Sequence, residues 1–327
     1  MGASDTRPTS NPGFAPTTRT PIAVRHTGVV SASVAVVGTL NMDLIVTVDR
    51  RPEVGETVLG RSLTERPGGK GANQALAAAG QVATVLIGAV GDDDAGRRMR
   101  DAQRAGGVNT DHVVVHDGVS GRAVIEVDAS GDNRIIVISG ANAELSPAET
   151  TSALDATDPA IVLTQLESPR TVTEAAATWA RRHGRRFALN PSPAVALDAD
   201  LLACADPLIV NEGEARFYAG QGDSETGRAD PERGTGDDAA AIAETLLDRS
   251  RSAVITLGGA GVVVATADGI TSIAVDRVDA AETTGAGDHF AGILVARLAA
   301  GDDLPTAARL AAAAATAYIT SRARPAL

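Results

Sequence analysis

Short apolar runs alternate with alanine-rich stretches along most of this 327-residue chain, and this alternation limits its fold more than any other feature. The apolar runs have the length of buried strands, and they are Val34–Val37, Val85–Ile87, Ile161–Leu163, Ala188–Leu189, Leu208–Val210 and Val254–Leu257. The alanine-rich stretches have helical character, and they are Gln74–Ala79, Thr173–Arg182, Ala239–Asp248 and Phe290–Ala300. Strands and helices at this spacing predict an α/β fold, a three-layer sandwich around a central, mostly parallel sheet.

Two segments interrupt the alternation. Val58–Thr64 and Arg122–Ile138 show the period of two that is typical of strands with one covered face, and the second contains a turn at residues 129–132. We expect these segments to form a small β-sheet lid, over about residues 44–66 and 118–138, beside the main sheet.

The first 32 residues differ in composition from the rest. They are rich in Thr, Pro, Ser and Gly, and they lack the apolar core of a secretory signal. We expect residues 1–32 to be a disordered tail and residues 33–327 to form one domain.

Charge and composition exclude several classes of function. The chain has 29 Lys and Arg against 41 Asp and Glu, a net charge of −12, and only 2% aromatic residues, which argues against nucleic-acid binding. No apolar run approaches the roughly 18 residues of a membrane span. The single cysteine, Cys204, excludes an internal disulfide. We expect a cytoplasmic globular protein with no membrane partner.

Two polar residues directly follow the first predicted strand. Asn41 and Asp43 would lie at the carboxyl edge of the sheet, where ligands bind in open parallel sheets. A carboxylate beside an amide suits a vicinal diol, because the carboxylate accepts hydroxyl protons and the amide both donates and accepts. Asn and Asp are also common in turns for local backbone reasons, so both interpretations stay open.

Two glycine-rich motifs each lead into a predicted helix. In Gly68-Gly69-Lys70-Gly71 the missing Cβ atoms allow a ligand to approach the backbone, although a turn with a solvated lysine is the alternative. In Gly285-Ala286-Gly287-Asp288 the free N–H groups would form an anion hole, and Asp288 would accept a proton from an attacking hydroxyl. The alternative is that Asp288 only stabilises the first helical turn.

Further polar and glycine residues follow other strands. Glu167 and the stretch 211–214, Asn-Glu-Gly-Glu, would lie at the same sheet edge, but either one alone is better explained as a helix cap or a solvated charge. The loop 256–261 could cradle a nucleotide, although a glycine loop alone is a weak signal.

Taken in order, these motifs resemble the ribokinase-like carbohydrate kinases from about Ser33 to the C-terminus, and within them the ribokinase branch. Residues 68–75 resemble the sugar-side signature of that family, and residues 285–288 resemble its catalytic signature. Shorter matches in the same order are residues 41–43, 165–167, 190–194, 211–214 and 255–258.

The resemblance implies a role for each matched residue. The sugar would be bound by Asn41, Met42, Asp43, Gly69, Lys70, Gly71, Ala72, Asn73, Glu167 and Asp288. Catalysis would rest on Asp288 as the base, beneath the anion hole of Gly285, Ala286 and Gly287. ATP with Mg²⁺ would be held by Asn211, Glu214, Thr256, Leu257, Gly258, Gly259, Ala260, Gly261, Gly287 and Asp288.

The resemblance also implies an activating K⁺ and a homodimer formed through the lid. The K⁺ site would use Glu282, Thr284, Ser321 and Ala323. Here Glu282 replaces the usual Asp, the chain ends soon after Ala323, and Ala312 takes the place of a polar residue on the adenine side.

The sequence thus predicts ATP-dependent phosphorylation of D-ribose at its 5-hydroxyl. A kinase for 2-deoxyribose or another small furanose is the alternative among enzymes. A sugar sensor that binds without phosphorylating is the alternative from another class.

Overall fold

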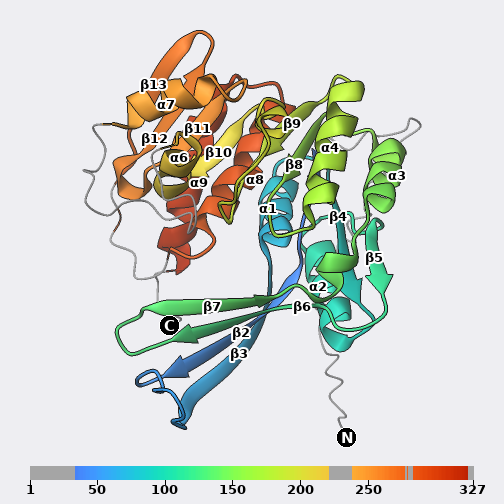
Figure 1. Cartoon of the computed structure of the whole chain (residues 1–327), viewed down its shortest axis with the longest axis vertical. Helices are drawn as coiled ribbons and strands as arrows, with labels where there is room; N and C mark the ends of the chain where they lie inside the picture. Colours follow the sequence, from blue (N-terminus) through green and yellow to red (C-terminus); the bar gives the residue numbers. More distant parts are fainter. Residues whose placement is uncertain (1–33, 221–237, 277, 279–282, 323–327) are drawn as a thin grey trace, which may run out of the picture. The chain divides into compact units, whose positions relative to one another are not determined.

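Nine strands form the central sheet, in the order β13-β12-β11-β10-β9-β8-β1-β4-β5 (Figure 1). In that order the strands are β13 (Gly269–Ile273), β12 (Val262–Thr266), β11 (Ala253–Thr256), β10 (Leu208–Asn211), β9 (Arg186–Leu189), β8 (Ile161–Thr164), β1 (Val34–Val37), β4 (Thr84–Gly91) and β5 (Val113–His116). All neighbours pair in parallel except β11 with β12 and β12 with β13, which are antiparallel. The predicted mostly parallel sheet is confirmed.

The structure is a computed structural model that describes residues 34–220, 238–276, 278 and 283–322. The predicted tail over residues 1–32 lies outside the described residues. The predicted division of the chain near residue 33 therefore stays a prediction.

Helices cover both faces of this sheet. The central strand β1 shows why: Val34 and Val36 pack into one hydrophobic cluster, whereas Ala35 and Val37 pack into the other, and none is more than 1% exposed. The first cluster contains residues of α1 (Lys70–Ala79), α2 (Asp94–Ala105), α8 (Ala286–Ala299) and α9 (Leu304–Arg322). The second contains residues of α3 (Pro147–Thr157), α4 (Arg170–Arg182), α5 (Ala199–Leu202), α6 (Glu212–Tyr218) and α7 (Ala239–Leu247). The predicted three layers are therefore confirmed.

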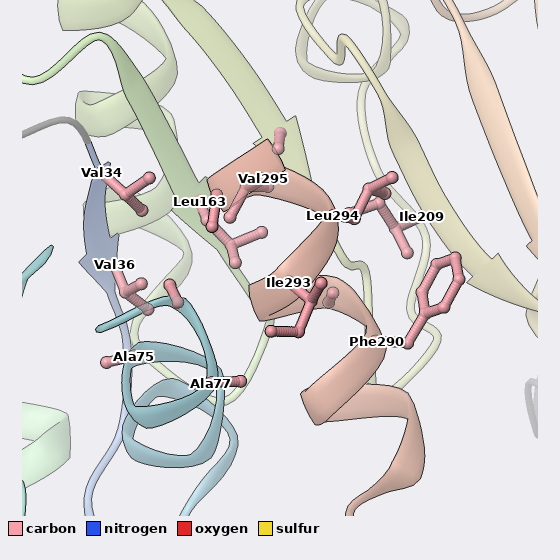
Figure 2. Packing of buried hydrophobic residues seen from close by; sticks show 14 of the residues in the cluster. Val34, Val36, Ala75, Ala77, Leu163, Ile209, Phe290, Ile293, Leu294 and Val295 are labelled. Carbon is pink, nitrogen blue, oxygen red and sulfur yellow. The ribbon is translucent and has the colours of Figure 1, made fainter. Parts of the chain in front are cut away.

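Helices α1 and α8, whose first turns carry polar residues of the predicted site, pack on the same face of the large sheet. Figure 2 shows Val34, Val36, Leu163 and Ile209 of the sheet in one hydrophobic cluster with Ile293, Leu294 and Val295 of α8. Alanine and glycine let the two helices approach closely, because a Cβ on Gly292 of α8 would lie 2.3 Å from the Gln74 carbonyl oxygen of α1. This packing fixes the first turns of both helices beside each other.

Four strands form a second, small sheet in the order β3-β2-β6-β7 (Figure 1). They are β3 (Gly60–Gly68), β2 (Asn41–Val48), β6 (Gly121–Val127) and β7 (Asn133–Ile138). The separate small sheet is confirmed, with β2 beginning three residues before the predicted start at 44 and β3 ending two residues beyond 66. Asn41 and Asp43 therefore belong to a strand of this sheet, and the alternative interpretation of them as turn residues is wrong.

Helices α1 and α8 begin four residues earlier than the apolar pattern predicts. Each starts directly after a glycine with a positive φ, 95° at Gly69 and 82° at Gly285, a conformation that glycine adopts without strain. The sequence pattern missed these first turns because they carry mostly polar and small residues instead of large apolar side chains.

Two short 3₁₀ turns complete the described elements. They are η1 (Gly140–Glu144) and η2 (Gly258–Ala260).

Candidate active site

Asp288 lies in the first turn of α8 and is oriented by two amide side chains of α1. Asn73 Nδ2 donates to Asp288 Oδ2 at 3.1 Å, and Gln74 Nε2 donates to Oδ1 at 3.0 Å. Each carboxylate oxygen keeps a second lone pair, since an ionised carboxylate accepts at about four positions. Asp288 is thus held in one orientation and can still accept a hydroxyl proton.

A pocket of about 140 Å³ opens beside Asp288. Its lining residues come from the carboxyl ends of neighbouring strands and from the first turns of three helices, and they are Lys70, Asn190, Ser192, Ile209, Val210, Asn211, Glu214, Thr256, Gly285, Gly287, Asp288 and Phe290. The structure therefore brings together the predicted base, part of the predicted anion hole and three residues of the predicted nucleotide side.

Asp43 and Glu167 form the other end of the site. Thr39 Oγ1 donates to Glu167 Oε2 at 2.6 Å, which fixes the Glu167 carboxylate. Burial raises the pKa of Asp43 to about 6, the nearby Arg66 guanidinium lowers this pKa, and the carboxylates of Glu167 and Asp288 raise it. Three interacting carboxylates in one place suit a neutral ligand with several hydroxyl donors.

Glycine makes room for Asp43. A Cβ on Gly68 would lie 2.3 Å from Asp43 Oδ2. The neighbouring Gly69 is equally restricted, because its Cβ would lie 2.7 Å from the backbone nitrogen of Asn41. The glycines of the sugar-side motif therefore bring the start of α1 against the start of β2.

Asn142 holds Asn41 and was missed by the sequence analysis. Its Nδ2 donates to Asn41 Oδ1 and to the Leu40 carbonyl oxygen, both at 2.9 Å, and its Oδ1 accepts from the Leu40 backbone N–H at 3.0 Å. Asn142 lies in η1, about one hundred residues from its partners and in no recognisable motif. The pairing of β2 with β6, and of β6 with β7, brings the segment that follows β7 back to the start of β2.

Some predicted site residues pack against the protein itself. Met42 points opposite to Asn41 and Asp43, and its side chain lies in the hydrophobic core at 1% exposure. Gly71 and Ala72 pack against the backbone of Gly38 and Thr39, and the Ala72 N–H donates to the Thr39 carbonyl oxygen. The side chains of Met42 and Ala72 thus serve packing, and the predicted sugar contacts at Met42, Gly71 and Ala72 stay a prediction.

Asn211 and Glu214 form a reciprocal cap at the start of α6. The Glu214 backbone N–H donates to Asn211 Oδ1 at 2.8 Å, and the Asn211 backbone N–H donates to Glu214 Oε2 at 2.9 Å. Both residues also line the pocket. Burial raises the pKa of Glu214, while hydrogen bonds from Asn211 and Ser192 and the charge of Lys70 lower it. A single buried carboxylate suits a Mg²⁺ ion that keeps most of its water shell.

The loop after β11 divides into two parts. Thr256 lines the pocket, and the exposed turn η2, residues 258–260, follows it. Leu257 packs against the hydrophobic core, and Gly261 is buried with its missing Cβ only 2.1 Å from the Ile273 carbonyl oxygen. Leu257 and Gly261 thus have a packing role in this structure, and their predicted place on the nucleotide side stays a prediction.

Two of the four residues predicted to hold K⁺, Glu282 and Ala323, lie outside the described residues. Thr284 is exposed, and Ser321 Oγ donates to the Tyr318 carbonyl oxygen at 2.8 Å. Over the described ranges, no group of three or more His, Cys, Asp or Glu side chains is placed to hold a metal ion.

None of the helices in the described part of the chain has the length and apolar character that crossing a membrane requires.

Comparison with known proteins points to sugar phosphorylation. The pfkB family of carbohydrate kinases matches residues 31–324. Ribokinase of Bacillus subtilis is 37% identical over 293 residues, which cover 88% of this chain and 93% of that protein. Deoxyribokinase of Salmonella typhi is 34% identical and covers 79% of this chain and 83% of its own length.

A solved structure shows the same architecture. Arabidopsis thaliana ribokinase in complex with ribose and ATP superposes with a TM-score of 0.74 at 26% identity, covering 89% of this chain and 93% of that chain. The chain belongs to the pfkB family of carbohydrate kinases, and it is an ATP-dependent sugar kinase.

Proposed function

We propose that this kinase transfers the γ-phosphoryl group of ATP to the 5-hydroxyl of D-ribose and releases D-ribose 5-phosphate and ADP. The observation that carries the proposal is the placement of Asp288. Its carboxylate is held by Asn73 and Gln74 at the start of α8, beside the N–H groups of a glycine-rich turn and next to two further carboxylates. That arrangement suits a polyol on one side and a phosphoryl group on the other.

The transfer follows from this arrangement. The 5-hydroxyl oxygen forms a bond to the γ-phosphorus while the bond from that phosphorus to the β,γ-bridging oxygen breaks. Asp288 accepts the hydroxyl proton, and ADP leaves with the electrons of the broken bond. General base catalysis of this kind contributes about 10²–10⁴ in rate.

The phosphoryl group gathers negative charge as it moves. Backbone N–H groups of residues 285–287 at the start of α8 would stabilise that charge, because helix N-termini carry partial positive charge. Lys70 lines the same pocket and would add a compact positive charge. When bound, Mg²⁺ supplies further charge neutralisation on the phosphates, and Glu214 would orient part of its water shell.

The sugar would be recognised by Asn41, Asp43 and Glu167. Asn142 fixes Asn41, and Thr39 fixes Glu167, so two of the three side chains are already oriented. Preorganised polar groups strongly discriminate against a ligand that lacks one hydroxyl, because a buried polar group is then left without a partner. The preoriented groups therefore favour ribose over 2-deoxyribose.

A kinase for 2-deoxyribose or another small furanose is the second candidate, and the similarity to a deoxyribokinase supports it. Comparing kcat/KM for D-ribose and 2-deoxy-D-ribose decides between them, with ADP release as the readout and mass spectrometry to identify the product. We expect ribose to be preferred by at least tenfold, and equal values would rule out ribose specificity. Ribose binding without ADP release would favour a sugar sensor.

The predicted activation by K⁺ is tested by measuring the turnover of both sugars with and without K⁺.

The role of Asp288 has its own test. Asp288→Asn keeps the size of the side chain but removes the proton acceptor, so we expect kcat to fall at least about a hundredfold while ribose still binds. Turnover like that of the wild type would show that Asp288 is not the base.

We also propose that two copies pair through the small sheet. Its outer strand β7 carries four consecutive apolar residues, Ile135–Ile138, each between 48% and 64% exposed. Such an edge strand is normally covered in a native protein. The cytoplasmic location and the absence of nucleic-acid partners stay predictions.

A further inference from the structure

We propose that three amides, the buried Gln165 and Gln74 and the partly exposed Asn190, act as one series of positioning residues that fixes how Asp288 is presented to the sugar. The inference rests on the proposed function in treating Asp288 as the base. It assigns to Gln74 and Gln165 a role in the rate of transfer that neither sugar binding nor nucleotide binding requires. The series of amides links the carboxyl ends of β8 and β9 to α1 and α8 (Figure 1).

The hydrogen bonds that link the three amides have a fixed direction, because Asn190 at one end is bonded to the backbone. Asn190 Nδ2 donates to the Ile209 carbonyl oxygen at 2.9 Å. A carbonyl oxygen can only accept, so the Asn190 amide must turn its NH₂ group toward Ile209 and its Oδ1 toward Gln74. The orientation of Asn190 is therefore set by the main chain.

Gln74 must follow the orientation of Asn190. Its Nε2 carries two hydrogens and donates one to Asn190 Oδ1 and one to Asp288 Oδ1, both at 3.0 Å. Rotating this amide by 180° would place Oε1 against two oxygen atoms with no hydrogen between them. An N–H therefore always faces Asp288 Oδ1, and that oxygen is presented as an acceptor.

Gln165 holds the other end of Gln74. Its Nε2 donates to Gln74 Oε1 at 2.6 Å, which favours the same orientation from the opposite side. Gln165 does not itself line the pocket, and its amide donates to Gln74, so we expect its influence on transfer to pass through Gln74. This makes Gln165 the residue on which the inference can be tested.

These amides are costly to bury. Gln74 is fully buried and Gln165 is 2% exposed, and Gln165 Oε1 has no hydrogen-bond partner within the described ranges. Gly38 makes room for it, because a Cβ there would lie 2.1 Å from this oxygen. An apolar side chain of equal length would avoid the unsatisfied oxygen, so folding alone does not explain a glutamine here.

The test replaces each glutamine with methionine, which keeps the length and removes the hydrogen bonds. We expect Gln74→Met to lower kcat at least tenfold and Gln165→Met to lower it about threefold or more, while the KM for ribose stays within threefold of the wild type. The double variant should be no slower than Gln74→Met alone, because Gln165 acts only through Gln74. Gln103→Met is the matched control: Gln103 is 1% exposed in α2, away from the series of amides, and this variant should keep kcat within twofold.

Folding is followed separately by circular dichroism, and ribose binding by calorimetry. If Gln74→Met does not fold, the isosteric Gln74→Glu replaces it, and this variant should lose kcat at least as strongly because it turns an oxygen toward Asp288. Wild-type kcat in folded Gln74 and Gln165 variants, or independent multiplicative losses in the double variant, would overturn the inference. A wild-type protein without ribose turnover, or an active Asp288→Asn variant, would instead overturn the proposed function.

Discussion

The two sheets of this kinase differ in how far the chain itself covers them. Every residue of β1 in the large sheet is at most 1% exposed, whereas Ile136 in β7 of the small sheet is 64% exposed. The large sheet is completed by helices on both faces, so it holds its carboxyl edge and the starts of α1 and α8 rigidly. The small sheet has an open apolar strand and carries Asp43 and Asn41.

This difference assigns different tasks to the two sheets. Asp288, its amide partners and the pocket beside it belong to the layered body around the large sheet. Asp43 reaches the same site from the small sheet. We therefore expect substitutions in the large sheet and its helices to affect stability and kcat. Substitutions in the small sheet should affect the KM for ribose and the formation of the proposed dimer.

The largest effect is expected from a cavity in the large sheet. Leu163 is fully buried in the core (Figure 2), so Leu163→Ala should lower the free energy of unfolding by about 2–5 kcal/mol. Leu63→Ala is the matched change in the small sheet, where the side chain is 64% exposed, and it should cost less than about 0.5 kcal/mol. Urea unfolding at concentrations that keep the chain monomeric measures both, and equal losses would contradict the difference in burial.

The next effect concerns Asp43. Asp43→Asn removes a charged acceptor for sugar hydroxyls, so the KM for ribose should rise about 10- to 100-fold. In the wild type the same KM should rise as the pH falls through about 6, because Asp43 then takes up a proton. A pH-independent KM between pH 5 and 8 would refute this role.

The same shift in pKa affects stability. The pKa of Asp43 is higher in the folded protein than its ordinary value of 3.8, so the ionised carboxylate destabilises the fold above pH 6. Asp43→Asn should stabilise the ligand-free protein at pH 7 by about 1 kcal/mol, after allowance for solvent screening. This gain should disappear below about pH 4, where Asp43 is protonated in both states.

A smaller effect is expected at Lys70, the single lysine beside 28 arginines. Lys70→Arg keeps the charge but replaces a compact ammonium with a broad planar group, so kcat should fall roughly tenfold, or about 1.4 kcal/mol. Arg61→Lys, an exposed change in the small sheet, is the control and should leave kcat within twofold. Normal turnover by Lys70→Arg would mean that the choice of lysine has no catalytic importance.

The smallest effect on turnover is expected at the open strand. Ile136→Asp should convert the proposed dimer into a monomer in light scattering and leave kcat within about twofold, because no residue of β7 is among those that line the pocket. Leu310→Asp, at a 41% exposed position of α9, should leave the dimer intact. A monomeric wild type would contradict pairing through this strand.

The sequence predicted the large sheet well because its strands are continuous apolar runs and its motifs follow them directly. It placed Asp288 and Lys70 in one site because both motifs open helices at the same sheet edge. It could not predict that Met42 lies in the core and that Leu257 packs against it, because a motif does not specify which side chains face the ligand. Asn142 and the link from Gln165 to Gln74 depend on contacts between residues 91 or more positions apart, which no local pattern records.

Ribose binding by two variants tests the division between the sheets most directly. Isothermal titration of Asp288→Asn and Asp43→Asn with D-ribose, together with ATP turnover, separates binding from transfer. The account predicts that Asp288→Asn binds ribose within about threefold of the wild type with almost no turnover, whereas Asp43→Asn loses ribose affinity at least about tenfold. An Asp288→Asn protein that no longer binds ribose, beside an Asp43→Asn protein that binds it normally, would contradict it.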